Sequence, residues 1–214
     1  GAVSVAGGAV TLRDANSLQL ALVASGASSV GAGGTLRVAA TVGTSATTPT
    51  NLALTSGAAA TLGAIDVKGA LSLTSAGEVV QLASTTLKTT GAATITATGQ
   101  RVTLANAGND LGGVLTLASA EATVLDINAL SVALNTSGAT SLTAAGLTLS
   151  GAVRGAALAA TSTGPTVFSA TEVEGALTLS STGAVSQTGG SLVVGGPTTL
   201  TATGQAVTLT REGN

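Results

Sequence analysis

The chain lacks most of the residue types that carry catalysis or fill a large hydrophobic core. Its 214 residues include no Cys, His, Trp, Tyr or Met, and Phe168 is its one aromatic residue. Without Cys there is no disulfide, no thiolate zinc cluster and no thiol chemistry. Without His or Cys, nucleophilic and metal-assisted catalysis have few groups to work with. We therefore predict that the protein is not an enzyme, and we predict no catalytic, cofactor-binding or metal-binding residue.

Charge is also scarce. Seven basic and nine acidic residues give a formal net charge of −2. Scattered cations do not form the basic face that phosphate backbones require, so nucleic acid is not an expected partner. No run of about 18 apolar residues predicts a membrane-spanning helix, and membrane insertion is not expected. The opening GAVSVAGG has no basic segment typical of a signal peptide.

The residues that are present alternate with a period of two. Stretches such as Leu71-Ser72-Leu73-Thr74 place aliphatic side chains on one face of a strand and hydroxyls on the other. Thr and Val favour the extended backbone, and most of the 30 glycines fall in turns between short strands. Mean hydropathy is +0.58, which is unlike a disordered chain. The pattern predicts an all-β protein.

The chain also repeats itself. ITATGQRVTLANAGN (residues 95–109) and LTATGQAVTLTREGN (200–214) share ten of fifteen positions at an offset of 105. Residues 10–22 match 122–134, and residues 68–81 match 174–187. We therefore predict one continuous β-solenoid over residues 1–214, built from tandem units at approximately 1–111 and 112–214. Because the second unit ends in phase with the first, we expect the chain to be a segment of a longer array.

Similar strand phrases recur within each unit every 18 to 24 residues, which is typical of solenoid coils. About ten coils, stacked by parallel pairing, would form a rod about 50 Å long. A narrow interior suits Leu, Val, Ile and Ala, and it explains the near absence of aromatic side chains, which would overfill it. Differences in the repeat offset are expected to be absorbed by insertions at the corners.

The phrases VTLANAGND (102–110), GGVLTL, LDINALSVAL and GALTLSSTGAVSQTGGSLVVGGPTTLTATGQAVTLT resemble the repeat region of filamentous-haemagglutinin-like exoproteins. These are secreted adhesins of Gram-negative bacteria that use two-partner secretion. The resemblance implies a right-handed parallel β-helix, a location outside the cell or at its surface, and a shaft role. Neither the secretion domain nor a toxin domain of that family is recognisable in the sequence.

Three patterns could carry a site. Asp14-x-Asn16 and Asp126-x-Asn128 offer oxygen ligands, but two or three oxygens are too few for Ca²⁺, and turn formation is the favoured interpretation. Glu172 and Glu174 lie two residues apart, as an acid–base pair could, yet Asp66 and Lys68 occupy the matching positions. Thr94-x-Thr96-x-Thr98 and Thr199-x-Thr201-x-Thr203 resemble ice-binding arrays, but such triples are too rare, and solvated strand faces are expected.

Two functions follow as hypotheses. The first is a structural shaft of a secreted bacterial surface fibre, whose partner is itself, by end-to-end stacking or by continuation of the repeat array. The second is an adhesin segment that binds glycans of a host or a neighbouring cell through outward Thr, Ser and Asn. No aromatic platform is available for sugar stacking, so such binding is expected to be weak. No cofactor is expected in either case.

Overall fold

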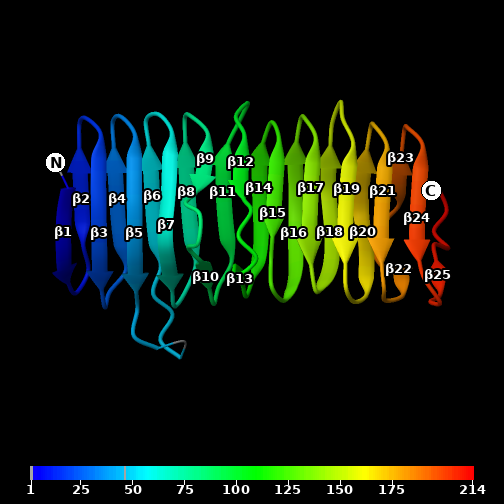
Figure 1. Cartoon of the computed structure of the whole chain (residues 1–214), viewed down its shortest axis with the longest axis horizontal. Helices are drawn as coiled ribbons and strands as arrows, with labels where there is room; N and C mark the ends of the chain where they lie inside the picture. Colours follow the sequence, from blue (N-terminus) through cyan, green and yellow to red (C-terminus); the bar gives the residue numbers. More distant parts are fainter. Residues whose placement is uncertain (1, 46) are drawn as a thin grey trace.

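The protein is a straight rod of stacked coils, built from two parallel β-sheets. A computed structural model describes residues 2–45 and 47–214, and these residues form 25 strands in two sheets, A and B. Figure 1 shows the strands side by side along the rod, with the N-terminus at one end and the C-terminus at the other. The alternating apolar pattern has therefore produced strands throughout.

Sheet A contains thirteen strands: β1 (Ala2–Gly7), β3 (Leu18–Ala24), β5 (Leu36–Val42), β7 (Ala60–Val67), β9 (Val79–Gln81), β10 (Leu87–Thr89), β12 (Val102–Leu104), β13 (Asp110–Leu111), β15 (Ala122–Leu125), β17 (Thr140–Ala144), β19 (Leu158–Ser162), β21 (Leu177–Ser181) and β24 (Thr198–Ala202). Sheet B contains twelve: β2 (Thr11–Asp14), β4 (Ser28–Ala32), β6 (Leu52–Ser56), β8 (Leu71–Ser75), β11 (Ala93–Ala97), β14 (Val114–Ser119), β16 (Ala129–Thr136), β18 (Gly146–Val153), β20 (Thr166–Val173), β22 (Val185–Gln187), β23 (Leu192–Val194) and β25 (Val207–Thr208).

The chain passes from one sheet to the other in each coil and returns one strand further along. Eleven strands in each sheet follow this path, so the described chain forms eleven coils. Paired residues in neighbouring coils are 17 to 25 positions apart. The all-β parallel solenoid is confirmed, with eleven coils where the sequence predicted about ten. Within the described residues, no helix is long and apolar enough to cross a membrane.

The core is a set of aliphatic columns that run along the rod. In sheet B, Val30, Leu54, Leu73, Ile95 and Leu117 pair in succession, each directly above the last. All five are at most 2% exposed. Fully burying a side chain of this size is worth about 1.5–3 kcal/mol, so every coil contributes to stability only when a neighbour covers it.

Variation in coil length is absorbed at one corner and at two bulges. The longest coil carries the nine-residue connection between β5 and β6, whose described residues 43–45 and 47–51 project from the rod below β6 and β7 (Figure 1). The same coil contains a register shift between Val38 and Ala40. The matching part of the second unit has a shift between Leu149 and Gly151 but only a four-residue connection. The connection between β5 and β6 therefore lies at a corner, as the sequence predicted, whereas the two bulges lie within strands β7 and β20.

The corners bring backbones of successive coils close together. A Cβ on Gly57 would overlap the carbonyl of Gly33 in the coil before, so glycine is required there. Buried serines next to these turns tie neighbouring coils together: the Ser75 hydroxyl donates to Ala58 O at 2.8 Å, and Ser181 donates to Gly164 O at 2.8 Å. These two contacts occupy matching positions of the two units.

The two units do not occupy the same sheets. Residues 10–22 form β2 and β3, in sheets B and A, whereas the matching residues 122–134 form β15 and β16, in sheets A and B. The exchange recurs at β8 and β21, and at β11 and β24. Strand β1 is first in the path of sheet A, and its counterpart β14 is sixth in the path of sheet B. One unit therefore advances by five and a half coils.

The internal repeat predicts how the single aromatic residue can be replaced. Phe168 is fully buried, and the matching residue of the first unit is the fully buried Leu62. We expect Phe168→Ala to lower the free energy of unfolding by about 3–5 kcal/mol because it leaves a cavity. Phe168→Leu should cost less than about 1.5 kcal/mol. Urea denaturation measures both, and equal losses would contradict equivalent packing in the two units.

Candidate interaction surfaces

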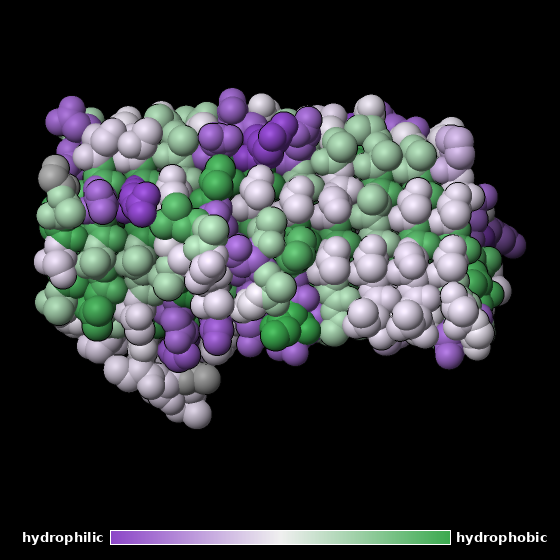
Figure 2. Space-filling model, viewed as in Figure 1, coloured by the Kyte–Doolittle hydropathy of each residue, from purple (hydrophilic) through white to green (hydrophobic). Residues whose placement is uncertain are grey.

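The outer surface of sheet A carries two columns of hydroxyls, which begin at the end of the first unit and run along the second. Strands β12, β15, β17, β19, β21 and β24 pair in register, so outward residues of successive strands are direct neighbours. We call these residues the hydroxyl face: Thr103, Thr123, Ser141, Thr178 and Thr199 in one column, and Thr143, Thr161, Ser180 and Thr201 in the other. Figure 2 shows two regular rows of near-white residues along this half of the rod.

The first unit has a matching array on the other sheet. Its strands β4, β6, β8 and β11 carry Ser29, Thr55, Ser72, Thr74, Thr94 and Thr96 at the equivalent outward positions of sheet B. Because the units exchange sheets, the two arrays lie on opposite sides of the rod. The sequence predicted outward threonines at 94, 96, 199 and 201 correctly, but Thr98 and Thr203 fall in turns after the strands.

The hydroxyl arrays are more continuous than the Thr-x-Thr triples indicated. The columns combine Thr and Ser from coils whose local sequences differ. In one column, Ala159 stands between Ser141 and Thr178. Neighbouring strands are about 4.8 Å apart and alternate residues of a strand about 6.6 Å apart, so these side chains form a flat rectangular lattice. Such a surface can donate and accept hydrogen bonds at many points, but it supplies no group for proton or electron transfer at neutral pH.

The Asp-x-Asn motifs form turns. The backbone N–H of Asn16 donates to Asp14 Oδ1 at 2.8 Å, and that of Asn128 donates to Asp126 Oδ1 at 2.8 Å. Burial raises the pKa of Asp126, and the nearby carboxylate of Asp110 acts in the same direction. Hydrogen bonds from the N–H groups of Leu111 and Asn128 act against this shift and lower the pKa. The geometry is that expected from turn chemistry.

The two glutamates make separate contacts. Glu172 is exposed at the end of β20, and Glu174 lies in the following turn, where its Oε2 accepts a hydrogen bond from Gly155 N at 2.6 Å. At the matching positions, Lys68 Nζ forms an ion pair with Asp66 at 2.8 Å. An anion pair in one unit and an ion pair in the other are typical of a solvated edge.

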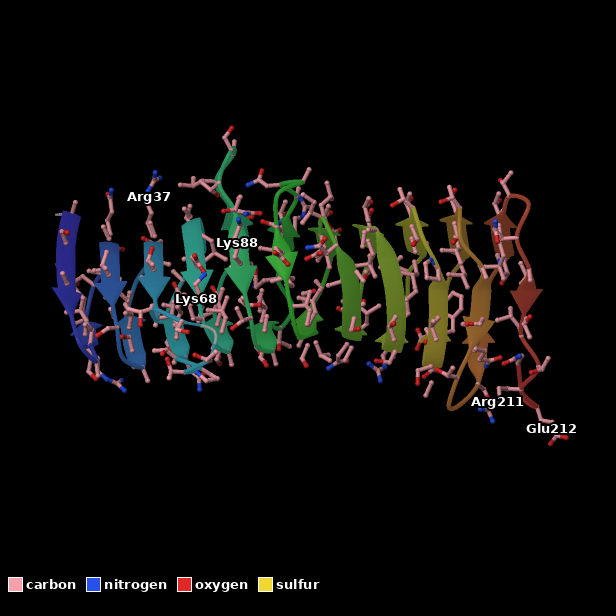
Figure 3. The ribbon with its side chains drawn as sticks, turned by 90° about the horizontal axis from the view of Figure 1, so that it is seen from below. Arg37, Lys68, Lys88, Arg211 and Glu212 are labelled. Atoms are coloured by element: carbon pink, nitrogen blue, oxygen red, sulfur yellow. The ribbon has the colours of Figure 1, made fainter. Side chains whose placement is uncertain are left out.

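Charged groups are dispersed over the rod. Figure 3 shows Arg37 pointing away from sheet A, Lys68 and Lys88 on other coils, and Arg211 and Glu212 at the C-terminal end. Among the described residues, no three Asp or Glu side chains are grouped so that they could hold a metal ion.

A buried amide network, which the sequence did not predict, joins the two units. Asn109 is fully buried, and its side chain exchanges two hydrogen bonds with Gln81, at 2.6 and 3.0 Å. Its Oδ1 also accepts from Leu87 N at 2.9 Å, and its Nδ2 donates to Leu104 O and Leu125 O at 3.2 Å. Since Leu125 belongs to the second unit, Asn109 holds the end of one unit against the start of the next.

The same network recurs at the C-terminal end. Asn214 exchanges hydrogen bonds with Gln187 at 2.7 and 3.0 Å, and its Oδ1 accepts from Leu192 N at 2.9 Å. Here Asn214 is exposed because no described coil follows it. The signal in the sequence was the presence of Gln and Asn at matching positions of both units, in a chain otherwise poor in long polar side chains.

Comparison with known proteins finds a repeat family. A family model described as repeats of unknown function (DUF5649) matches residues 49–118 and residues 155–214. The two matches, of 70 and 60 residues, cover more than half of the chain. No curated protein and no solved structure matches the chain. The first match begins in the connection after β5, and the second begins in the connection after β18. The boundaries of the family repeat therefore differ from those of the units defined above.

The amide network predicts a difference between two matched variants. Asn109→Leu removes the partners of several buried polar groups, and we expect it to lower the free energy of unfolding by about 3 kcal/mol or more. Asn214→Leu, at the exposed counterpart, should cost less than about 1 kcal/mol in the isolated chain. Urea denaturation of both variants tests this, and similar losses would show that burial of the network contributes little.

Proposed function

The chain belongs to this family of DUF5649 repeats. We propose that it is a structural shaft segment of a secreted bacterial surface fibre. The observation that carries the proposal is the unbroken parallel pairing through eleven coils. Every coil is held by backbone hydrogen bonds and by aliphatic columns that continue into the next coil. A rod of this kind resists bending and fixes the distance between its two ends, which is about 50 Å for eleven coils.

The surface fits the same role. The side chains that point outward are mostly Thr, Ser and Ala, and charged residues are too dispersed to form a catalytic cluster. Conserving a core pattern while loops and outward residues vary is characteristic of solenoids, whose coils tolerate insertions at corners. The connection 43–51 is one such insertion, and the core beneath it is continuous.

The location outside a Gram-negative cell rests on the resemblance of the repeats to those of filamentous-haemagglutinin-like exoproteins. The lack of Cys is compatible with an extracellular rod, since the structure is stabilised by coil stacking and needs no disulfide. Export by two-partner secretion is part of the same proposal.

Two measurements test the shaft. Small-angle scattering of the purified chain should give a rod about 50 Å long, because coils add about 4.8 Å each. Antibodies raised against the chain should label intact cells of the source organism as strongly as permeabilised cells. A compact scattering profile would exclude the shaft, and labelling confined to permeabilised cells would exclude the surface location.

A second function, adhesion, is favoured by the hydroxyl face. Two lattices of outward Thr and Ser lie on opposite sides of one rod, so the segment could contact two carbohydrate surfaces at once. Each hydroxyl both donates and accepts, which matches the hydroxyls of glycans. The contacts would be individually weak, and affinity would come from their number.

Adhesion is tested with paired variants. Thr161→Asp with Thr178→Asp places two carboxylates in the hydroxyl face and should reduce binding to a glycan array or to intact cells at least tenfold, about 1.4 kcal/mol. Val23→Asp changes an exposed residue of the same sheet outside that face and is the matched control. Equal binding by both variants and the unchanged chain would reject the hydroxyl face as a glycan site.

A further inference from the structure

We propose that the connection between β5 and β6 is a modification site, where a separate enzyme attaches sugars to the hydroxyls of Thr47 and Thr48. The inference goes beyond the shaft, because it makes the rod a carrier of glycans. It requires neither the shaft role nor a location outside the cell. It rests on the composition of this connection, on its position on the rod and on the pairing of its backbone.

The connection is rich in hydroxyl side chains. Residues 43–51 read GTSATTPTN, in which five of nine residues carry a hydroxyl and one is proline. Segments rich in Ser and Thr with Pro are typical of O-glycosylated stalks. No residue from 38 to 65 is charged, and the connection contains no large apolar side chain. It therefore supplies acceptor hydroxyls, but no group that could hold a protein partner by charge or by apolar contact.

The acceptor hydroxyls stand clear of the rod. The described residues of the connection project below β6 and β7 (Figure 1). Thr47 and Thr48 are both exposed. Thr50, at the base of the connection, is buried, and its hydroxyl donates to Thr48 O at 3.1 Å. An enzyme can therefore reach Thr47 and Thr48 without opening a coil, whereas Thr50 is not an expected acceptor.

The backbone of the connection is anchored at its two ends. Gly43 N donates to Ala24 O at 2.8 Å, and Thr50 N donates to Lys68 O at 2.8 Å. Within the described residues between Gly43 and Thr50, no backbone group pairs with another backbone group. Pro49 favours an extended backbone at Thr48. This segment can therefore enter the active site of a transferase without breaking hydrogen bonds of a β-sheet.

The hydroxyls on the strands lack this access. Thr55 is exposed on β6, but β6 pairs with β4 on one side and with β8 on the other, so its backbone is fixed within the sheet. The matching connection of the second unit, residues 154–157, reads RGAA and contains no hydroxyl. We therefore expect the modification in the first unit and not at the equivalent place in the second.

The covalent step is a glycosyl transfer. Oγ1 of Thr48 attacks the anomeric carbon of a sugar that is activated as a diphosphate ester. The bond between that carbon and the ester oxygen breaks, and the diphosphate leaves with the bonding electron pair. The hydroxyl proton passes to a base of the transferase. The same step applies to Thr47, and in both cases this chain supplies only the acceptor oxygen.

A phosphate group is the less favoured modification. Enzymes that phosphorylate proteins discriminate among substrates by patterns of charge around the acceptor. The uncharged stretch from residue 38 to 65 offers no such pattern. The acceptor chemistry therefore favours a sugar, and the two modifications differ in the mass they add.

Mass spectrometry of the whole chain, purified from its source organism and then digested, tests the proposal. Trypsin cleaves after Arg37 and Lys68, so one peptide, residues 38–68, contains the entire connection together with Thr55. We expect this peptide to carry the mass of one or more sugar residues. Fragmentation that preserves the glycosidic bond should place the sugars on Thr47 or Thr48.

Two variants expressed in the same organism provide the comparison. Thr47→Ala with Thr48→Ala should remove most of the modified peptide, whereas Thr55→Ala, the matched control on the same peptide, should leave the modified fraction unchanged. All three residues are exposed, so both variants are expected to fold. A peptide without sugar, sugar on Thr55 as often as on Thr47 and Thr48, or phosphate in place of sugar would each overturn the proposal. None of these results would affect the shaft, which scattering tests separately.

Discussion

The structure depends on one constraint, the in-register parallel pairing of each coil with the next. Pairing places inward residues of successive coils directly above one another, so most buried aliphatic residues meet an aliphatic residue in the neighbouring coil. The narrow space between the two sheets is filled mainly by Leu, Val, Ile and Ala, with one phenylalanine and with buried Ser and Thr near strand ends, such as Ser56, Ser75 and Thr166. From this follow the scarcity of aromatic residues, the outward Thr and Ser, and the glycines where corners approach closely.

Much of this was readable in the sequence because the governing signals are local. Alternation in Leu71-Ser72-Leu73-Thr74 predicted an exposed–buried pattern that β8 shows residue by residue. Turn chemistry at Asp14 and Asp126 was also local, since each carboxylate accepts from a backbone N–H two residues later. The insertion at 43–51 agreed with the change in sequence separation between matching segments of the two units.

Other features depend on counting strands and on distant contacts, which an alignment of phrases does not supply. The sheet exchange could not be predicted, because it requires knowing that an odd number of sheet crossings separates matched strands such as β8 and β21. The hydrogen-bond network of Asn109 could not be predicted for a similar reason. Its partners Gln81 and Leu125 lie 28 and 16 residues away in the sequence and meet it only when the coils stack. The hydroxyl face was underestimated because its columns join residues from six strands.

The half-coil offset between units has a mechanical consequence. Each unit carries a bulge and short strands off the main path on one sheet: β7, β10 and β13 mark sheet A in the first unit, and β20 and β23 mark sheet B in the second. Such irregularities bend a sheet toward one side. Because successive units place them on opposite sides, the bend introduced by one unit is cancelled by the next. A long array of these units would therefore run straight, although each unit alone is asymmetric.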